Sequence, residues 1–266
     1  MLDEKELSQK LMVAERLKQK SGGFMGFGKK ADYVGSGMIY EEIAELVQET
    51  DAKEKYYNEA AETFAQEDNE YGLWRASECY RLLYEIFIKD DRDKAADFQM
   101  LGVDLLRRIK KYNIAGQRCV ILGELYEIDQ TEKALGFFKK AVEFYSEVQG
   151  YKANLKIVKL KVLLCQIILK NVTEIIGMLR ENERLIDRGQ LCLQMMLILN
   201  GEYKEAIDNE LTRKDEKMLV DGVLNGTAED VPALIDQFRS NNHLGVHAEL
   251  MMDLFVEKYG LEQEIC

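Results

Sequence analysis

Residues 21–30, SGGFMGFGKK, could bind a phosphate group, because the spacing of Gly23, Gly28 and Lys29 matches that of a phosphate-binding loop. That loop also needs Ser or Thr after the lysine to bind magnesium, and Lys30 stands there instead. The residues before the stretch have helical periodicity, whereas a phosphate-binding loop follows a strand. The sequence therefore disfavours a nucleotide-binding site.

The two histidines of the chain form a second candidate site. His243 and His247 are four residues apart and share one face if their segment is helical. A catalytic zinc ion needs a third ligand and a general base. Glu249 is two residues beyond His247, so a helix directs it elsewhere. No serine-nucleophile motif is present either, and we expect a protein that is not an enzyme and uses no metal or cofactor.

The elements that position these residues are predicted to be helices. Hydrophobic residues make up 47% of the 266 residues, and Pro232 is the single proline, although average usage is about 5%. Proline interrupts a helix because it lacks an N–H and clashes with the preceding turn. Its near absence, together with abundant Ala, Leu, Glu and Lys, predicts an all-α fold.

An internal repeat indicates how the helices are arranged. Lys55, Lys94 and Lys133 are evenly spaced along the chain, each near the start of a helical segment. Three apolar positions that follow them keep the same spacing: Phe64, Val103 and Val142. Each repeat thus contains two amphipathic helices joined by a turn. One such hairpin cannot bury its apolar face alone, so neighbouring hairpins must stack.

This period predicts a tetratricopeptide-like right-handed solenoid of antiparallel helical hairpins, with repeats slightly longer than the usual length of about 34 residues. We assign the hairpin sheet, including the apolar loop at 21–30, to residues 1–211. Two glycines and the proline then indicate a change of packing, and residues 212–266 are predicted to form a helical bundle with an acidic tail.

The distribution of charge limits the class of partner. A net charge of −12 argues against nucleic acid, because that binding depends on neutralising phosphates. Residues 107–118 and 152–161 nevertheless contain several lysines and arginines and no acid. They occupy equivalent places in successive repeats, so we expect them to form a basic stripe for an acidic partner. Ordinary solvated lysines are the alternative.

The five cysteines are far apart, and we expect Cys79, Cys119, Cys165 and Cys192 to be small apolar residues in a reducing compartment. The first ten residues contain no hydrophobic signal segment. The longest near-apolar stretch, residues 162–169, is far shorter than the roughly 20 residues that span a bilayer. We expect a soluble cytoplasmic protein.

The order of these features resembles the SNAP family, the soluble NSF attachment proteins. The likeness is strongest in residues 111–160, KYNIAGQRCVILGELYEIDQTEKALGFFKKAVEFYSEVQGYKANLKIVKL, and weaker in NGEYKEAIDNEL and DGVLNGTAEDVPALIDQF. The resemblance implies a twisted sheet of helical hairpins capped by a bundle. It also implies an adaptor in vesicle trafficking, which binds assembled SNARE complexes and recruits the ATPase NSF to dissociate them after membrane fusion.

The resemblance further implies three contact regions. An apolar loop between the first two helices would touch an anionic membrane, peripherally and reversibly, through Phe24, Met25, Phe27, Lys29 and Lys30. The residues implied for SNARE binding are Lys111, Arg118, Lys156 and Lys159. Those implied for NSF binding are Asp221, Glu262, Glu264 and Ile265, the last in place of the family's penultimate leucine.

Three alternatives remain open for these regions. The loop at 21–30 can instead pack against its own helix, and the tail can be a frayed terminus. The whole chain can also be a helical-repeat scaffold for a different protein.

Overall fold

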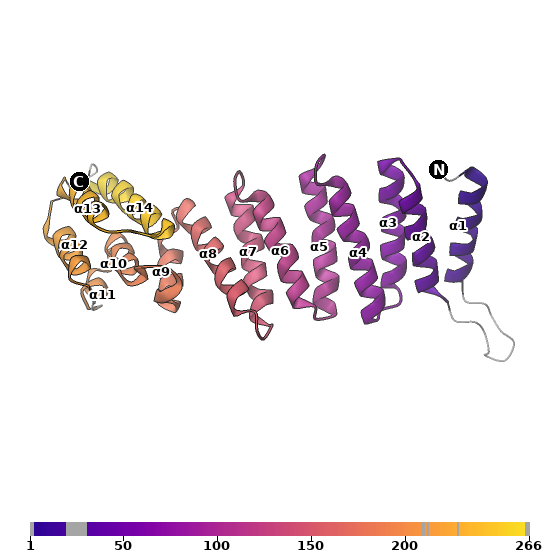
Figure 1. Ribbon diagram of the computed structural model, residues 1–266, viewed down its shortest axis with the longest axis horizontal. Coiled ribbons are helices and arrows are strands. Elements are labelled where there is room, and N and C mark those ends of the chain that lie inside the picture. The colour runs from indigo at the N-terminus through magenta and orange to yellow at the C-terminus, as the bar shows by residue number, and fades with distance from the viewer. Residues whose placement is uncertain (1–2, 20–30, 209–210, 212, 228, 264–266) are drawn as a thin grey trace. The chain divides into compact units, whose positions relative to one another are not determined.

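The computed structural model describes residues 3–19, 31–208, 211, 213–227 and 229–263, and among these residues all regular structure is helical (Figure 1). The predicted all-α class is therefore confirmed. The first helices are α1 (Glu4–Lys18), α2 (Tyr33–Leu46), α3 (Thr50–Ala65), α4 (Glu70–Phe87), α5 (Arg92–Arg108), α6 (Tyr112–Tyr126) and α7 (Thr131–Ser146). They are followed by α8 (Lys152–Ile168), α9 (Val172–Glu181), the 3-10 turn η2 (Glu183–Leu185), α10 (Gly189–Leu199), α11 (Tyr203–Asp208), α12 (Lys214–Asn225), α13 (Asp230–Asn241) and α14 (Val246–Gln263).

Polar side chains fix where several of the helices begin. Asp32, Asn69 and Asp91 precede α2, α4 and α5, and each accepts a hydrogen bond from the backbone N–H three residues later, at 2.7, 2.8 and 2.9 Å. Such a cap satisfies one of the four N–H groups that a helix start leaves without a partner, and contributes about 1 kcal/mol.

Residues in the left-handed conformation follow the ends of several helices. Lys110, Lys170 and Gly201 have φ angles of 57°, 56° and 78°. After each, the next backbone N–H bonds to the carbonyl five residues earlier, as in Lys111 N to Leu106 O at 2.9 Å. This closing pattern turns the chain sharply, so that the next helix can run back along the one just completed.

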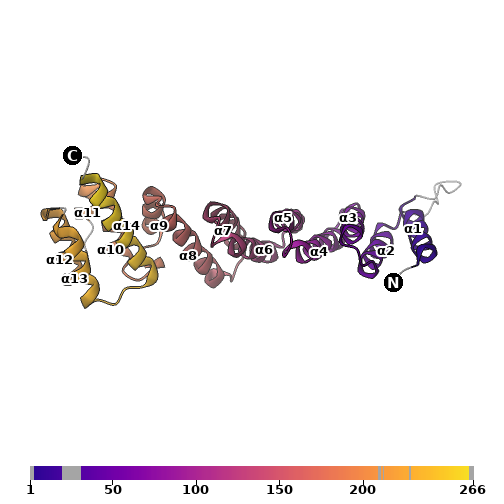
Figure 2. The ribbon, with the colours of Figure 1, turned by 90° about the horizontal axis from the view of Figure 1, so that it is seen from above.

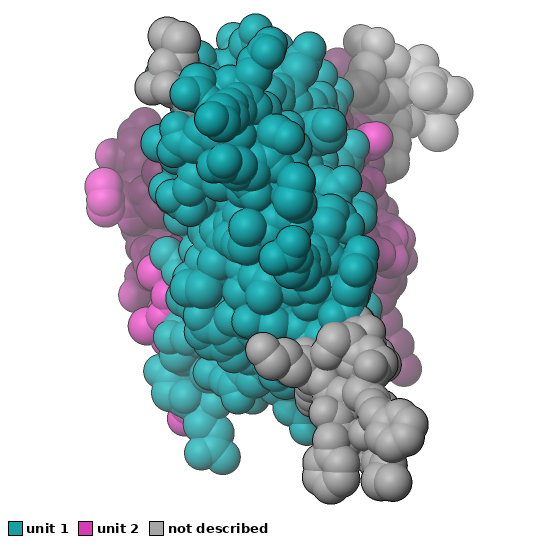
Figure 3. Space-filling model, turned by 90° about the vertical axis from the view of Figure 1, so that its right-hand side faces the viewer, with its two compact units in different colours: residues 1–122, 143–151 teal, residues 123–142, 152–266 magenta. Residues whose placement is uncertain are grey.

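The chain divides into two compact units, distinguished by colour in Figure 3. The first contains residues 1–122 and 143–151. In it, α1 to α5 each pack on the next helix, with α2 and α4 in one row and α3 and α5 in the other (Figure 2). Small, aromatic and aliphatic residues form its core, including Ala60, Phe64 and Leu83.

The contacts of equivalent residues confirm the period read from the sequence. Lys94 Nζ lies 4.1 Å from the centre of the Phe87 ring, and Lys133 Nζ lies 4.0 Å from the centre of the Tyr126 ring. Tyr126 follows Phe87 by the same interval as Lys133 follows Lys94, which is one repeat. A lysine at the equivalent position therefore lies over an aromatic ring at the equivalent position in successive repeats.

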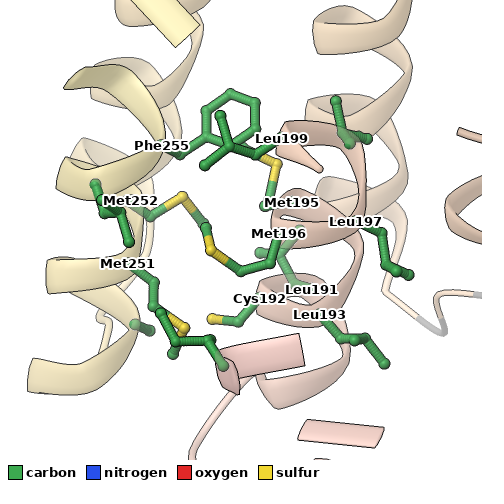
Figure 4. Packing of buried hydrophobic residues seen from close by; sticks show 14 of the residues in the cluster. Leu191, Cys192, Leu193, Met195, Met196, Leu197, Leu199, Met251, Met252 and Phe255 are labelled. Carbon is green, nitrogen blue, oxygen red and sulfur yellow. The ribbon is translucent and has the colours of Figure 1, made fainter. Parts of the chain in front are cut away.

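The second unit contains residues 123–142 and 152–266, and its core is built around α10. Every residue from 191 to 199 of this helix is buried, and all of them except Gln194 are apolar, as is expected of a helix enclosed by others. Met196 points toward Met252 of α14 and Cys192 points toward Met251, whereas Leu197 points to the opposite side of α10 (Figure 4). Methionine fills irregular space between helices that cross without a regular repeat.

This core extends from Leu163 to Phe255, so the division expected after residue 211 does not separate two cores. Helix α8 packs on α9 and α14, and α10 contacts α9, α11, α12 and α14. The right-handed sense of the solenoid stays a prediction.

Candidate interaction surface

Several basic residues of the first unit have acidic partners in the preceding repeat. In the first unit, Lys111 Nζ lies 2.7 Å from Glu70 Oε1, and Arg108 Nη2 lies 2.6 Å from Asp68 Oδ1. Lys94 pairs in the same way with Glu54, at 2.6 Å. These pairs join residues about one repeat apart, so they connect neighbouring hairpins and neutralise much of the expected basic stripe.

Arg118 is the clearest correction to the expectations from the sequence. Its side chain is only 4% exposed, so it does not belong to a surface that a partner can reach. Nη2 donates to Glu78 Oε1 at 2.6 Å, and Nη1 donates to the carbonyl of Ser77 at 3.0 Å. Desolvation by burial lowers the pKa of Arg118 from its ordinary value, while the Glu78 carboxylate opposes that shift.

The physical reason for this burial is a glycine. A Cβ atom on Gly102 of α5 would lie 2.6 Å from Arg118 Nη1 and 3.2 Å from the carbonyl oxygen of Ser77. Because Gly102 has no side chain, the guanidinium of α6 passes between the helices to reach α4. Nothing in the sequence pattern indicates that this particular cation points inward.

In the second unit, the cations of α8 are divided between paired and exposed positions. Lys161 pairs with Glu124 and Glu127, at 3.4 and 2.9 Å. Lys159 lies 3.9 Å from Glu181, and that glutamate is three-quarters exposed. A pair of this length in water contributes little, so Lys159 remains accessible to a partner.

The first two turns of α8 form an exposed cationic surface in this unit. Lys152 and Lys156 are both exposed and lie on one side of the helix, since they are four residues apart. Ile157 beside them is 56% exposed. Of the four residues implied for SNARE binding, Lys156 and Lys159 thus lie together on α8. Lys111 and Arg118 belong to the first unit, where both are engaged with acids of that unit.

A cavity of about 230 Å³, which the sequence reasoning did not predict, adjoins this surface. Its lining comes from α8, from η2 and the segment after it, and from the start of α14 with the glycine before it: Lys156, Leu160, Leu185, Ile186, Asp187, Gly245, His247 and Ala248. His247 Nε2 lies 3.3 Å from the carbonyl oxygen of Leu160, a contact that joins α14 to α8. The only feature of the sequence that points to such a site is a glycine directly before a helical segment, and this feature is a weak signal.

A second hollow of about 180 Å³ lies between α12 and α13. Beside it, Arg188 connects three segments: Nη1 lies 2.8 Å from Glu216 and 3.2 Å from Asp215, and Nη2 donates to Asn242 at 2.9 Å. Asp221, implied for NSF binding, is exposed on α12. Its side chain is therefore accessible.

The other residues implied for contacts lie outside the part of the chain that the structure describes. These are the loop residues Phe24, Met25, Phe27, Lys29 and Lys30, and the tail residues Glu264 and Ile265. Glu262 belongs to α14, but its side chain is not among those described. The segment before the loop forms α1, which agrees with its predicted helical periodicity.

The remaining chemical candidates have ordinary structural surroundings. His243 is exposed, and the described residues contain no group of three or more His, Cys, Asp or Glu placed to hold a metal ion. Cys79, Cys119, Cys165 and Cys192 are buried, as expected of small apolar residues. Burial raises the pKa of Cys165 to about 11 and that of Cys192 to about 12, so both stay protonated at neutral pH.

Within the described ranges, no helix combines the length and apolarity required to cross a bilayer. Comparison of the chain with models of known protein families gives no match, and comparison with curated proteins gives none either.

Proposed function

We propose that this protein is a SNAP-type adaptor, which binds an assembled SNARE four-helix bundle and engages an NSF-type ATPase that takes the bundle apart. The chain supplies geometry and charge, and the partner supplies ATP hydrolysis. The proposal rests on the resemblance in residues 111–160 and on the arrangement of helical hairpins followed by a bundle of helices.

The observation that carries the proposal is the composition of α8. This 17-residue helix contains no Asp or Glu, and its first two turns expose Lys152, Lys156 and Ile157. In a chain with a net charge of −12, such a surface favours an acidic, partly apolar partner. The exposed Asp221 on α12 of the same unit is available for the opposite kind of contact, with a basic partner.

Each contact is weak by itself. An exposed charge pair contributes about 0–1 kcal/mol, and several such contacts with two partners gain strength from effective concentration. This is the expected behaviour of an adaptor that must also release its partners. Peripheral contact with an anionic membrane through the loop at 21–30 adds a further weak attachment.

The test is a SNARE-disassembly assay with NSF and ATP, performed with and without this chain. Disassembly that requires the chain and weakens with Lys156→Glu supports the proposal. Lys140→Glu is the matched control, because Lys140 is an exposed lysine on α7 of the same unit. Disassembly that proceeds equally without the chain contradicts the proposal.

The second candidate is a helical-repeat scaffold for a different protein. It is favoured by the internal engagement of Lys111 and Arg118, which leaves fewer cations for an acidic bundle than the sequence indicates. A scaffold of this kind would neither bind assembled SNARE bundles nor alter the ATPase rate of NSF.

A further inference from the structure

We infer that the cavity at the start of α14 and the exposed face of α8 together form a docking site for an acidic amphipathic helix, which inserts one apolar side chain into the cavity. This inference rests on the proposed function, and it names the chemistry of the surface that a SNARE bundle must present.

Four apolar side chains in the lining of the cavity are suited to contact an apolar side chain of a partner. Leu185 and Ala248 are buried, and Leu160 and Ile186 are partly buried against the core of the second unit. A volume of about 230 Å³ is far more than a single water molecule requires. Filling such a space with an aliphatic side chain removes apolar surface from water on both partners.

The rim of the cavity is cationic on the side of α8. Lys156 lines the cavity and is exposed, and Lys152 lies one turn before it. Lys159, three residues after Lys156, lies 3.9 Å from Glu181, a contact long enough to leave its charge available to a partner. A helix that carries acidic residues one turn to either side of its inserted side chain can meet these lysines.

Asp187 and His247 restrict where the acids of the partner can lie. Asp187 is part of the lining, so a carboxylate placed inside the cavity would be repelled, whereas one outside, near Lys152 and Lys156, would be attracted. The contact of His247 with the carbonyl of Leu160 holds the first turn of α14 against α8. The site therefore selects an apolar residue flanked by acids, and not an acidic residue alone.

Gly245 provides a way to fill the cavity without disturbing the core. It is exposed, it lines the cavity, and a Cβ atom there would meet nothing closer than Asp187 Cβ at 4.0 Å. We expect Gly245→Leu to weaken the binding of a purified, assembled SNARE bundle about tenfold, because the inserted apolar side chain loses its burial. Gly245→Ala, which leaves the cavity open, should bind as the unmodified chain does.

Gly177→Leu is the matched control for an added leucine. Gly177 is an exposed glycine of α9 in the same unit, with no atom within 4 Å of its Cβ position. Binding is measured by titration at two salt concentrations, and circular dichroism checks that each variant is folded. Lys156→Glu should also weaken binding, with a smaller salt dependence than that of the unmodified chain.

The outcomes separate this inference from the function it rests on. If the unmodified chain binds the SNARE bundle and folded Gly245→Leu binds equally well, the docking site is overturned and the adaptor function stands. If the unmodified chain binds no SNARE bundle at either salt concentration, the proposed function fails and the inference falls with it. Loss of SNARE-bundle binding in Gly245→Leu, but not in Gly177→Leu, supports both the docking site and the adaptor function.

Discussion

Arg118 lies against Gly102, so closely that a Cβ atom on the glycine would stand 2.6 Å from Nη1 of the arginine. The guanidinium uses this space to reach Glu78, and so connects α6 to α4 past α5. A residue that the sequence places in a basic surface run is therefore an internal connection among three helices.

The first prediction concerns Gly102. Gly102→Ala should destabilise the protein by about 1–3 kcal/mol, because the added methyl displaces the guanidinium from its two acceptors. Gly136→Ala on α7 is the control, since a Cβ there meets no atom within 4 Å. It should stabilise the protein by about 0.4–1 kcal/mol through the helix propensity of alanine. Urea denaturation measures the stability of both variants. If Gly102→Ala has the same unfolding midpoint as the unmodified chain, Arg118 does not need this space.

The second prediction concerns Arg118 itself. Arg118→Ala should reduce the free energy of unfolding by about 2–3 kcal/mol, somewhat below the usual cost of breaking a buried pair because Glu78 is one-quarter exposed. Arg107→Ala, which removes an exposed arginine 3.5 Å from Asp104, should change it by less than about 0.5 kcal/mol. Unchanged stability of Arg118→Ala, combined with loss of partner binding, would restore the surface role.

The third prediction is a loss of stability at alkaline pH. Burial raises the pKa of Cys192, and that of Tyr40 and Tyr57, to about 12. These groups keep their protons in the folded chain after the unfolded chain has lost them, so unfolding releases protons. Their contribution to the free energy of unfolding is fully present below pH 9, which is the ordinary pKa of a thiol. This contribution is lost as the pH rises towards 12.

Urea midpoints measured between pH 7 and pH 11 test this effect. We expect a steady fall above pH 9, and a shallower fall in a Cys192→Ala chain, which lacks one of the titrating groups. Midpoints that stay constant up to pH 11 would show that these side chains are not protected from ionisation in the folded state.

The fourth prediction follows from the proposed membrane contact. Phe24→Ser combined with Phe27→Ser should weaken binding to vesicles of anionic lipid about tenfold or more, and added salt should weaken the binding of the unmodified chain. Ile128→Ser is the control, because Ile128 is a 97% exposed apolar residue in the turn between α6 and α7. Sedimentation with vesicles measures each variant. Equal binding of the double variant would exclude this loop as the contact.

The fifth prediction concerns the stimulation of NSF. Ile265→Ala should reduce the ATPase rate of NSF in the presence of the chain and leave the unfolding midpoint unchanged, since the described core of the second unit extends only to Phe255. Ile265→Leu should retain or increase the stimulation, because leucine keeps the apolar character. An ATPase assay with NSF compares the variants, and the idea fails if alanine stimulates as well as isoleucine.

The repeat architecture was predictable because it depends on short-range patterns. The spacing of Lys94 and Lys133 marks equivalent helices, and both lysines cover an aromatic ring seven residues earlier. The caps at Asn69 and Asp91 are likewise local, since each bonds to an N–H three residues away. Periodicity and capping residues are sufficient to predict such features.

The partners of the cations were not predictable in this way. Residues 107–118 contain no acid, and yet Lys111 and Arg118 meet Glu70 and Glu78, which belong to the preceding repeat. Such pairings depend on the register between stacked helices, which composition does not fix. The cavity beside Lys156 depends in the same way on where α14 begins against α8.

The sequence by itself thus determined that the chain is all-α, that its helices recur with a regular period, and where several of them start. Only the tertiary structure decided that Arg118 is buried in the space left by Gly102, and that Lys156 and His247 line the same cavity. The reason is physical. A helix is specified by neighbours within one or two turns, whereas the exposure of a charge depends on which distant side chains, or which missing side chain, lie opposite it.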